Sequence, residues 1–168
     1  MKKVMYVMMF VVTSVTMNSC SADNAVKNEI ENTITDETLV ANYNYSNEEL
    51  ELMKLINDYR KSIGLNALER INHISYKSEE HNKYMIKNKK MSHDNFDSRS
   101  KNIMKLLRAK SIAENVAVSY PTPKAVLDGW LNSSGHKVNI EGDFTHFGLA
   151  ITTDASGKKY YTNIFVKI

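Results

Sequence analysis

Residues 130–148 read WLNSSGHKVNIEGDFTHFG, and the rest of the chain can be interpreted around them. Trp130, the only Trp of the protein, precedes His136 by six residues across a Ser-Ser-Gly break. A helix that ends near Ser133 would place Trp130 against a core, and Gly135 would let the backbone turn and present His136 from a new direction. The stretch therefore predicts a place where a hydrophobic core and a functional site meet.

Four helices are expected outside this stretch or leading into it. Ser46 and Glu49 form a capping box at the start of the first helix, and overlapping apolar stripes follow until Gly64. Apolar residues at helical spacing predict the other three helices over about Asn72–Asn88, Ser100–Arg108 and Lys124–Asn132.

Three strands are expected in the second half of the chain. Residues 146–152 and 160–166 alternate in the manner of strands, and the turn at 154–157 pairs them as a hairpin. Residues 111–118 predict a buried segment with Glu114 at its mouth. A carboxylate in that position needs a cation or hydrogen-bond donors, and histidines are the expected partners.

Composition indicates one folded domain of residues 46–168 with a modest positive charge. The whole chain has a net charge of +3, and from Tyr45 onward 19 Lys and Arg face 14 Asp and Glu. The basic residues gather in two groups, which are Lys83, Lys87, Lys89 and Lys90, and then Arg99, Lys101, Lys105, Arg108 and Lys110. Since no aromatic residues interleave with them, we interpret both groups as solvated helix faces and expect no nucleic-acid partner.

The sequence context indicates a functional role for some histidines and a structural role for others. His93 lies in a polar loop between apolar anchors, which is a better place for chemistry than a helix face. His73 and His81 have no evident partners in the sequence and are interpreted as surface or packed residues. His146, just before the expected hairpin, is assigned to solvent.

The N-terminus predicts export. Residues 1–20 combine Lys2 and Lys3 with an apolar run too short to span a bilayer. The run ends at Cys20, the only cysteine, in a context that resembles the lipobox of bacterial lipoproteins. Acylated Cys20 would anchor the protein to a membrane of the cell envelope, and residues 21–45, which are polar and acidic, would form a flexible tether. The alternative is ordinary signal cleavage and secretion. A lone cysteine also excludes an internal disulfide.

Several landmarks occur in a characteristic order along residues 46–168. They are Tyr59-Arg60, Ser92-His93, Ala113-Glu114-Asn115, Trp130 with Ser133, Gly135-His136, Phe147-Gly148-Leu149 and Tyr161 to Phe165. Together they resemble the CAP superfamily, also called the SCP domain, which is named after cysteine-rich secretory proteins, antigen 5 and pathogenesis-related 1 proteins. The resemblance is greatest to its small, disulfide-free bacterial branch. It implies an α+β fold, an α-β-α sandwich in which helices flank a central antiparallel sheet.

The resemblance also implies a cavity with two histidines and two acidic residues that can hold a divalent metal, commonly zinc. His93 matches the first histidine, Glu114 an acid and His136 the second histidine. Ser133 occupies the position that is acidic in eukaryotic members, which weakens any mechanism that needs two carboxylates.

Three functions remain open at this stage, and the first is preferred. An anchored, monomeric binding module would recognise a lipid, glycan or host protein through this cavity or its surface. A zinc-dependent, peptidase-like hydrolase would use His93 and His136 as ligands and Glu114 as general base. A purely structural role would have Glu114 simply hydrogen-bond both histidines.

Overall fold

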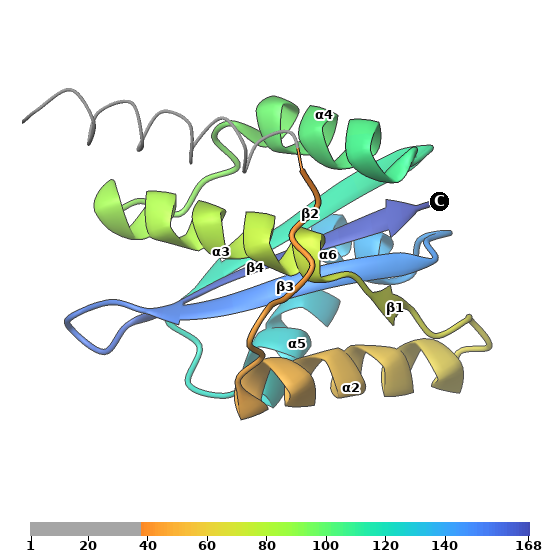
Figure 1. Ribbon diagram of the computed structural model, residues 1–168. Helices are drawn as coiled ribbons and strands as arrows, with labels where there is room; N and C mark the ends of the chain where they lie inside the picture. The colour runs from red at the N-terminus through yellow and green to blue at the C-terminus, as the bar shows by residue number, and fades with distance from the viewer. Residues whose placement is uncertain (1–37) are drawn as a thin grey trace, which may run out of the picture. The chain divides into compact units, whose positions relative to one another are not determined.

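The computed structural model describes residues 38–168, which lie within one compact unit, Ile34–Ile168 (Figure 1). The expected signal segment, the expected lipidation site Cys20 and most of the expected tether lie outside the described residues. Among the helices of this described part, none is long and apolar enough to cross a membrane.

The domain is a three-layer α-β-α sandwich, as expected. Its elements are α2 (Asn47–Ser62), β1 (Glu69–Arg70), α3 (Asn72–Lys87), α4 (Phe96–Leu107), β2 (Ser111–Val118), α5 (Pro123–Leu131), α6 (Ser134–Ile140), β3 (His146–Thr153) and β4 (Lys159–Lys167). The strand order is β1-β3-β4-β2. The expected antiparallel pairing holds for β2, β3 and β4, whereas the two-residue β1 adds to β3 in parallel. Helices α3 and α4 lie on one side of the sheet, and α2 and α5 on the other (Figure 1).

Hydrophobic residues fill both interfaces between helices and sheet. On the side of α2 and α5, Trp130 is almost completely buried and donates its indole N–H to the Val116 carbonyl at 3.3 Å. On the side of α3 and α4, Ile74 and Ile103 are buried against Ile164 of β4. Because the described residues carry a core on each face of the sheet, residues 38–168 hold what a domain needs to fold alone.

Helix α3 approaches β3 unusually closely at Gly148. A Cβ added there would lie 2.4 Å from the backbone nitrogen of Ser75, so no side chain fits. Ser78 and Asn82 also donate from α3 to carbonyl groups of β3, at Gly148 and Ala150. These contacts fix α3 on the sheet and thereby fix the start of the loop that carries His93.

The expected helices are confirmed, with differences at their ends. The capping box of Ser46 and Glu49 is present at the start of α2. Helix α4 begins at Phe96, four residues before the expected start, and therefore includes Arg99. The expected turn at Gly135 is wrong, because Gly135 lies within α6, a short helix that was not expected and that carries His136.

The chain before α2 follows the domain instead of leaving it at once. The Val40 backbone N–H donates to Nδ1 of the buried His73, and the Asn72 side chain donates to the Ala41 carbonyl. The Tyr45 hydroxyl hydrogen-bonds Ser75 at 3.0 Å. The last part of the expected tether is thus held against α3, and His73 is a packed histidine.

Candidate functional site

Glu114 is the buried centre of the candidate site. It lies on β2, the strand at one edge of the sheet, and only 7% of the residue is exposed. Its neighbours at the two-residue spacing of a strand, Ile112 and Val116, belong to clusters on the α3 and α4 side. The carboxylate is therefore presented beneath these two helices.

Arg99 of α4 forms a hydrogen-bonded ion pair with the carboxylate of Glu114. Its Nη2 lies 2.7 and 2.9 Å from the two carboxylate oxygens, and its Nε lies 3.0 Å from Oε2. Arg99 is itself buried, and its Nη1 donates to the Asp94 carbonyl at 3.0 Å. Such a bidentate pair satisfies both charges away from water.

His93 binds the same carboxylate from the loop between α3 and α4. Its Nδ1 lies 2.9 Å from Oε1 of Glu114, and an ionised carboxylate accepts only, so Nδ1 carries the proton. Burial by itself would raise the pKa of Glu114, but the hydrogen bond from His93 and the charge of Arg99 hold that pKa below its usual range. Glu114 is thus a firmly ionised carboxylate.

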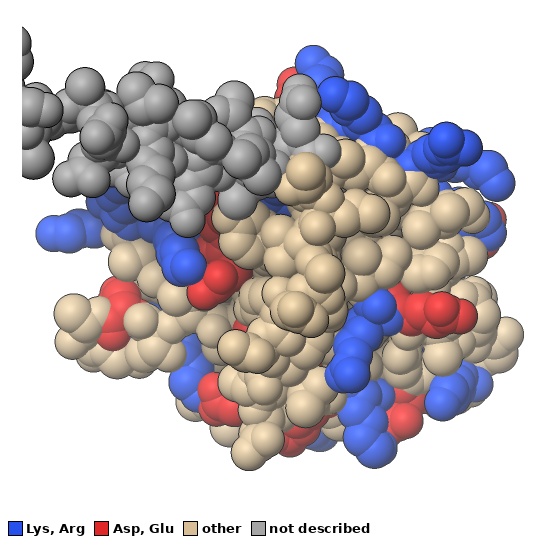
Figure 2. Space-filling model, in the orientation of Figure 1, with Lys and Arg blue, Asp and Glu red and all other residues tan. Residues whose placement is uncertain are grey.

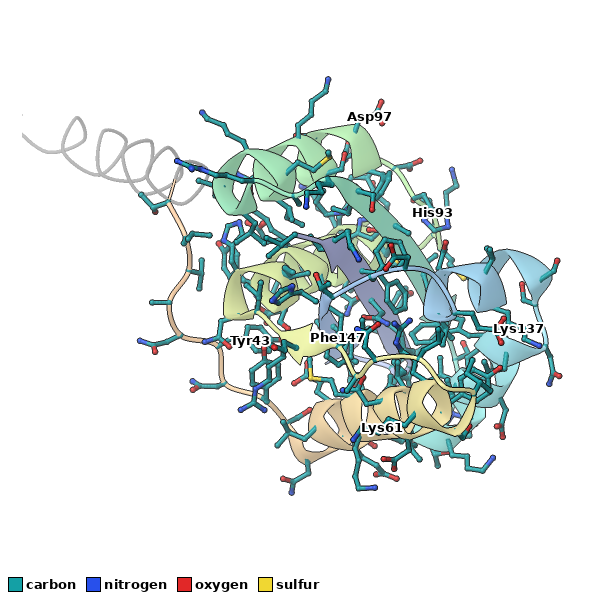
Figure 3. The ribbon with its side chains drawn as sticks, turned by 90° about the vertical axis from the view of Figure 1, so that its right-hand side faces the viewer. Tyr43, Lys61, His93, Asp97, Lys137 and Phe147 are labelled. Carbon is teal, nitrogen blue, oxygen red and sulfur yellow. The ribbon has the colours of Figure 1, made fainter. Side chains whose placement is uncertain are left out.

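His93 remains half exposed and borders a groove. The groove has a volume of about 460 Å³ and is lined by His93, Asn95, Phe96, Asp97 and Ser98. In Figure 3, His93 lies on the right, close to the start of α4, where Asp97 marks the upper end of this region. In a neutral imidazole with the proton on Nδ1, the lone pair lies on Nε2.

His81 holds the loop that carries His93 through a hydrogen bond to Ser92. It is buried in α3, and its Nε2 donates to the Ser92 carbonyl at 2.7 Å and lies 3.9 Å from Glu114. Burial lowers the pKa of His81, so the imidazole is neutral and Nδ1 carries a lone pair. No described residue hydrogen-bonds this buried Nδ1. The role of His81 in holding Ser92 and His93 was missed, because no partner for it is evident in the sequence.

His136 reaches the same edge of the sheet from the opposite layer. Its Nδ1 lies 2.8 Å from the Ser133 hydroxyl, and the Asn115 side chain donates to its backbone carbonyl at 3.0 Å. Burial and the charge of nearby His93 lower the pKa of His136. Since Asn115 follows Glu114 on β2, the strand presents one side chain to each layer, and His136 lies near enough to His93 for the two imidazoles to interact electrostatically.

The donor set around this edge fits only a weak metal site. Among residues 38–168, no group of three or more His, Cys, Asp or Glu side chains is placed to hold a metal ion. The carboxylate of Glu114 is taken by Arg99 and His93, which leaves Nε2 of His93 and of His136 as donors. Two imidazoles are fewer ligands than structural or catalytic zinc usually has, so only an exchangeable cation fits.

Glu114, His93, Ser133 and His136 are the site residues predicted from the sequence, whereas Arg99, the main partner of the carboxylate, was not predicted. Arg99 was assigned to a solvated helix face, and that assignment is wrong. Its helical phase could have revealed it, because Arg99, Ile103 and Leu107 repeat every four residues on the inward side of α4.

His146 was assigned to solvent, and its side chain is only 22% exposed. It lies on β3, 3.8 Å from Glu69 of β1, where the sheet is furthest from β2. His146 is therefore separate from the candidate site.

The model of the cysteine-rich secretory protein family, abbreviated CAP, matches residues 53–166. An uncharacterized membrane protein of Bacillus subtilis, YlbC, is 42% identical over 55 residues, which are 32% of this chain and 14% of that protein. The chain therefore corresponds to a small part of the length of that relative.

Two solved structures share the fold over most of the chain. An outer surface protein from Borrelia burgdorferi has a TM-score of 0.65 at 20% identity, covering 76% of this chain and 98% of that one. An extracellular protein containing an SCP domain from Bacillus anthracis has a TM-score of 0.62 at 26% identity, covering 72% of this chain and 40% of that one.

Proposed function

The chain belongs to the cysteine-rich secretory protein (CAP) family, and we propose that it is an exported binding module of the bacterial cell envelope and not a hydrolase. One observation carries the proposal: the carboxylate of Glu114 is held by Arg99 and His93. A general base must accept a proton near neutral pH, and a carboxylate whose pKa is lowered by the hydrogen bond from His93 and the charge of Arg99 does so poorly. Ser133 stands in place of the second acid, so that position supplies no alternative base.

The ligand contacts the groove beside His93. Its lining combines an imidazole, an amide, a carboxylate and a hydroxyl with the single aromatic ring of Phe96. Such a lining suits a glycan or a peptide better than a hydrocarbon chain, which needs a mostly apolar pocket. A divalent cation at His93 and His136 would polarise a ligand oxygen there, and Glu114 would orient His93 through its Nδ1 proton.

We expect zinc to bind weakly to residues 38–168, and we expect His93→Ala and His136→Ala each to lower its affinity at least tenfold. The reason is that the two imidazoles are the donors that the site leaves open. Isothermal titration calorimetry near neutral pH measures the affinity, and His146→Ala is the matched control because His146 lies outside the site. Undiminished zinc binding by both site variants would remove the metal from the proposal.

A peptide cleavage assay tests the alternative that the protein is a hydrolase. Zinc-stimulated cleavage of envelope peptides by the parent, lost in Glu114→Gln while the variant stays folded, would contradict a pure binding role. The binding role would be supported if the parent retained envelope glycans or peptides and Asp97→Ala did not. Asp97 is suitable for this test because it lines the groove and is not a partner of Glu114.

Export and anchoring rest on the N-terminal sequence, on the extracellular SCP-domain relative from Bacillus anthracis and on the membrane protein of Bacillus subtilis. We expect Cys20→Ser to move the protein from the membrane fraction to the soluble fraction, because acylation of Cys20 supplies the anchor. Cell fractionation with a high-salt wash measures this, and Ser21→Ala is the control. A Cys20→Ser variant that stays with washed membranes would exclude acylation as the anchor.

A further inference from the structure

The net positive charge of the described residues comes from one segment of the chain. Residues 81–113, which we call the basic layer, comprise the second half of α3, the His93 loop, α4, residues 108–110 and the first three residues of β2. They contain nine Lys and Arg and two Asp, a net charge of +7, whereas the other described residues have a net charge of −2. Figure 2 shows Lys and Arg gathered over α4 at the upper right of the view.

The charges of the basic layer face solvent. Only Arg99 is buried, against Glu114. The remaining eight are exposed, and they are Lys83, Lys87, Lys89, Lys90, Lys101, Lys105, Arg108 and Lys110.

Acidic residues balance only part of this charge. In α2, α5 and α6, basic residues have acids one turn away, as in Lys54–Asp58, Lys124–Asp128 and Lys137–Glu141. Within α3 and the loop after it, Lys83 has Glu79 and Lys90 has Asp94 in the same way. Helix α4 itself contains one acid, Asp97, and the basic residues Arg99, Lys101 and Lys105, so the helix carries a net positive charge.

The arrangement of these charges fits an extended anionic surface. They follow the helices and do not converge on one point, whereas a discrete phosphate is held by converging donors. Single-stranded nucleic acid would need exposed aromatic rings for stacking, and Phe96 is the only Phe, Tyr or Trp of α4. Met91 adds an apolar contact, because it is 54% exposed directly after Lys89 and Lys90. Lysines beside an exposed apolar side chain are typical of proteins that lie on a lipid surface.

We propose that the basic layer docks the domain on an anionic lipid bilayer, with Lys101, Lys105 and Arg108 facing the headgroups and Met91 entering the interface. These three residues repeat at helical spacing along the outer side of α4 and its C-cap. Docking of this kind does not depend on the ligand of the His93 groove. It would set how the domain, and with it that groove, is oriented toward the membrane.

Vesicle binding by residues 38–168 tests this without any contribution from Cys20. The parent should bind phosphatidylglycerol-containing vesicles and dissociate from them at high salt, and it should not bind pure phosphatidylcholine vesicles. The triple variant Lys101→Gln, Lys105→Gln, Arg108→Gln should bind on the order of 100-fold more weakly. The control triple Lys54→Gln, Lys124→Gln, Lys137→Gln has the same net charge with changes in α2, α5 and α6, and it should stay close to the parent. Melting curves check that both triples fold.

Three results would overturn the proposal. The parent could fail to bind anionic vesicles, or both triples could lose equal affinity, which would indicate net charge alone. Alternatively, soluble polyphosphate could bind the parent as tightly as vesicles do while Met91→Ser leaves vesicle binding unchanged, and the partner would then be a soluble polyanion. Weaker vesicle binding by Met91→Ser, with polyphosphate binding unaffected, is the result expected for a bilayer.

Discussion

Replacing Arg99 with Met is expected to lower the free energy of unfolding by about 3–5 kcal/mol near neutral pH, as for other buried ion pairs that lose one partner. Arg99 supplies three of the contacts shorter than 3.1 Å that satisfy the buried Glu114 carboxylate. Met fills a similar volume and is a good helix former, so the effect would come from the uncompensated charge. Thermal or chemical denaturation measures it.

The pH dependence of this variant separates the lost charge pair from lost packing. In the parent, the pKa of folded Glu114 lies below its ordinary value of 4.5. The contribution of ionised Glu114 to the free energy of unfolding is therefore complete above that value and is lost as the pH falls through the folded pKa. Without Arg99, burial raises the pKa of folded Glu114, and the folded state is then favoured at low pH and penalised as the pH rises. The difference between parent and Arg99→Met should therefore shrink from about pH 7 toward about pH 4.

Lys101→Met is the matched control, because Lys101 lies two residues further along α4 and is exposed. Its effect should stay within about 0.5 kcal/mol. A difference between Arg99→Met and the parent that stays constant over the same pH range would show that packing, and not the Glu114 charge, explains the loss.

Much of this fold could be predicted because its signals are local. The capping box of Ser46 and Glu49 involves residues three apart, and the turn at 154–157 joins adjacent strands. Both signals specify an element without knowledge of the rest of the chain. The order of the landmarks then indicated the sandwich, which the structure confirms.

The partner of Glu114 could not be predicted by the same means, because it depends on which basic side chain faces inward. Arg99 lies among five basic residues of similar appearance, and only the start of α4 at Phe96 places it in the first turn above β2. The short helix α6 was missed for a related reason. Its seven residues include Gly135, a poor helix former, and its position depends on tertiary contacts with Asn115 and Arg60.

Replacing Arg60 with Met is also expected to cost about 3–5 kcal/mol of stability, although Arg60 lies far from the candidate site in sequence. Arg60 lies near the end of α2 and is fully buried. Its guanidinium donates to the carbonyls of Asn66, Ile140, Gly142 and Phe144 at 2.9, 2.6, 2.9 and 3.4 Å, and to the Asn66 side chain at 3.2 Å. Met would take the charged donor away from the buried Ile140 carbonyl, whereas the Gly142 and Phe144 carbonyls would keep only the donors Phe144 N–H and Asn66 side chain.

The loss should be largest where these carbonyls lie, which is at the end of α6. Hydrogen exchange should therefore show the α6 amides opening earlier in Arg60→Met than in the parent, and His136, which α6 carries, should bind zinc less well before the domain unfolds. Arg60→Lys should recover part of the stability, since an ammonium group keeps the charge but has fewer donors than a guanidinium. The adjacent, exposed Lys61→Met is the control. Equal melting temperatures for the Arg60 and Lys61 variants would mean that α6 is held by its apolar contacts, with Ile140 at their centre, and not by the guanidinium.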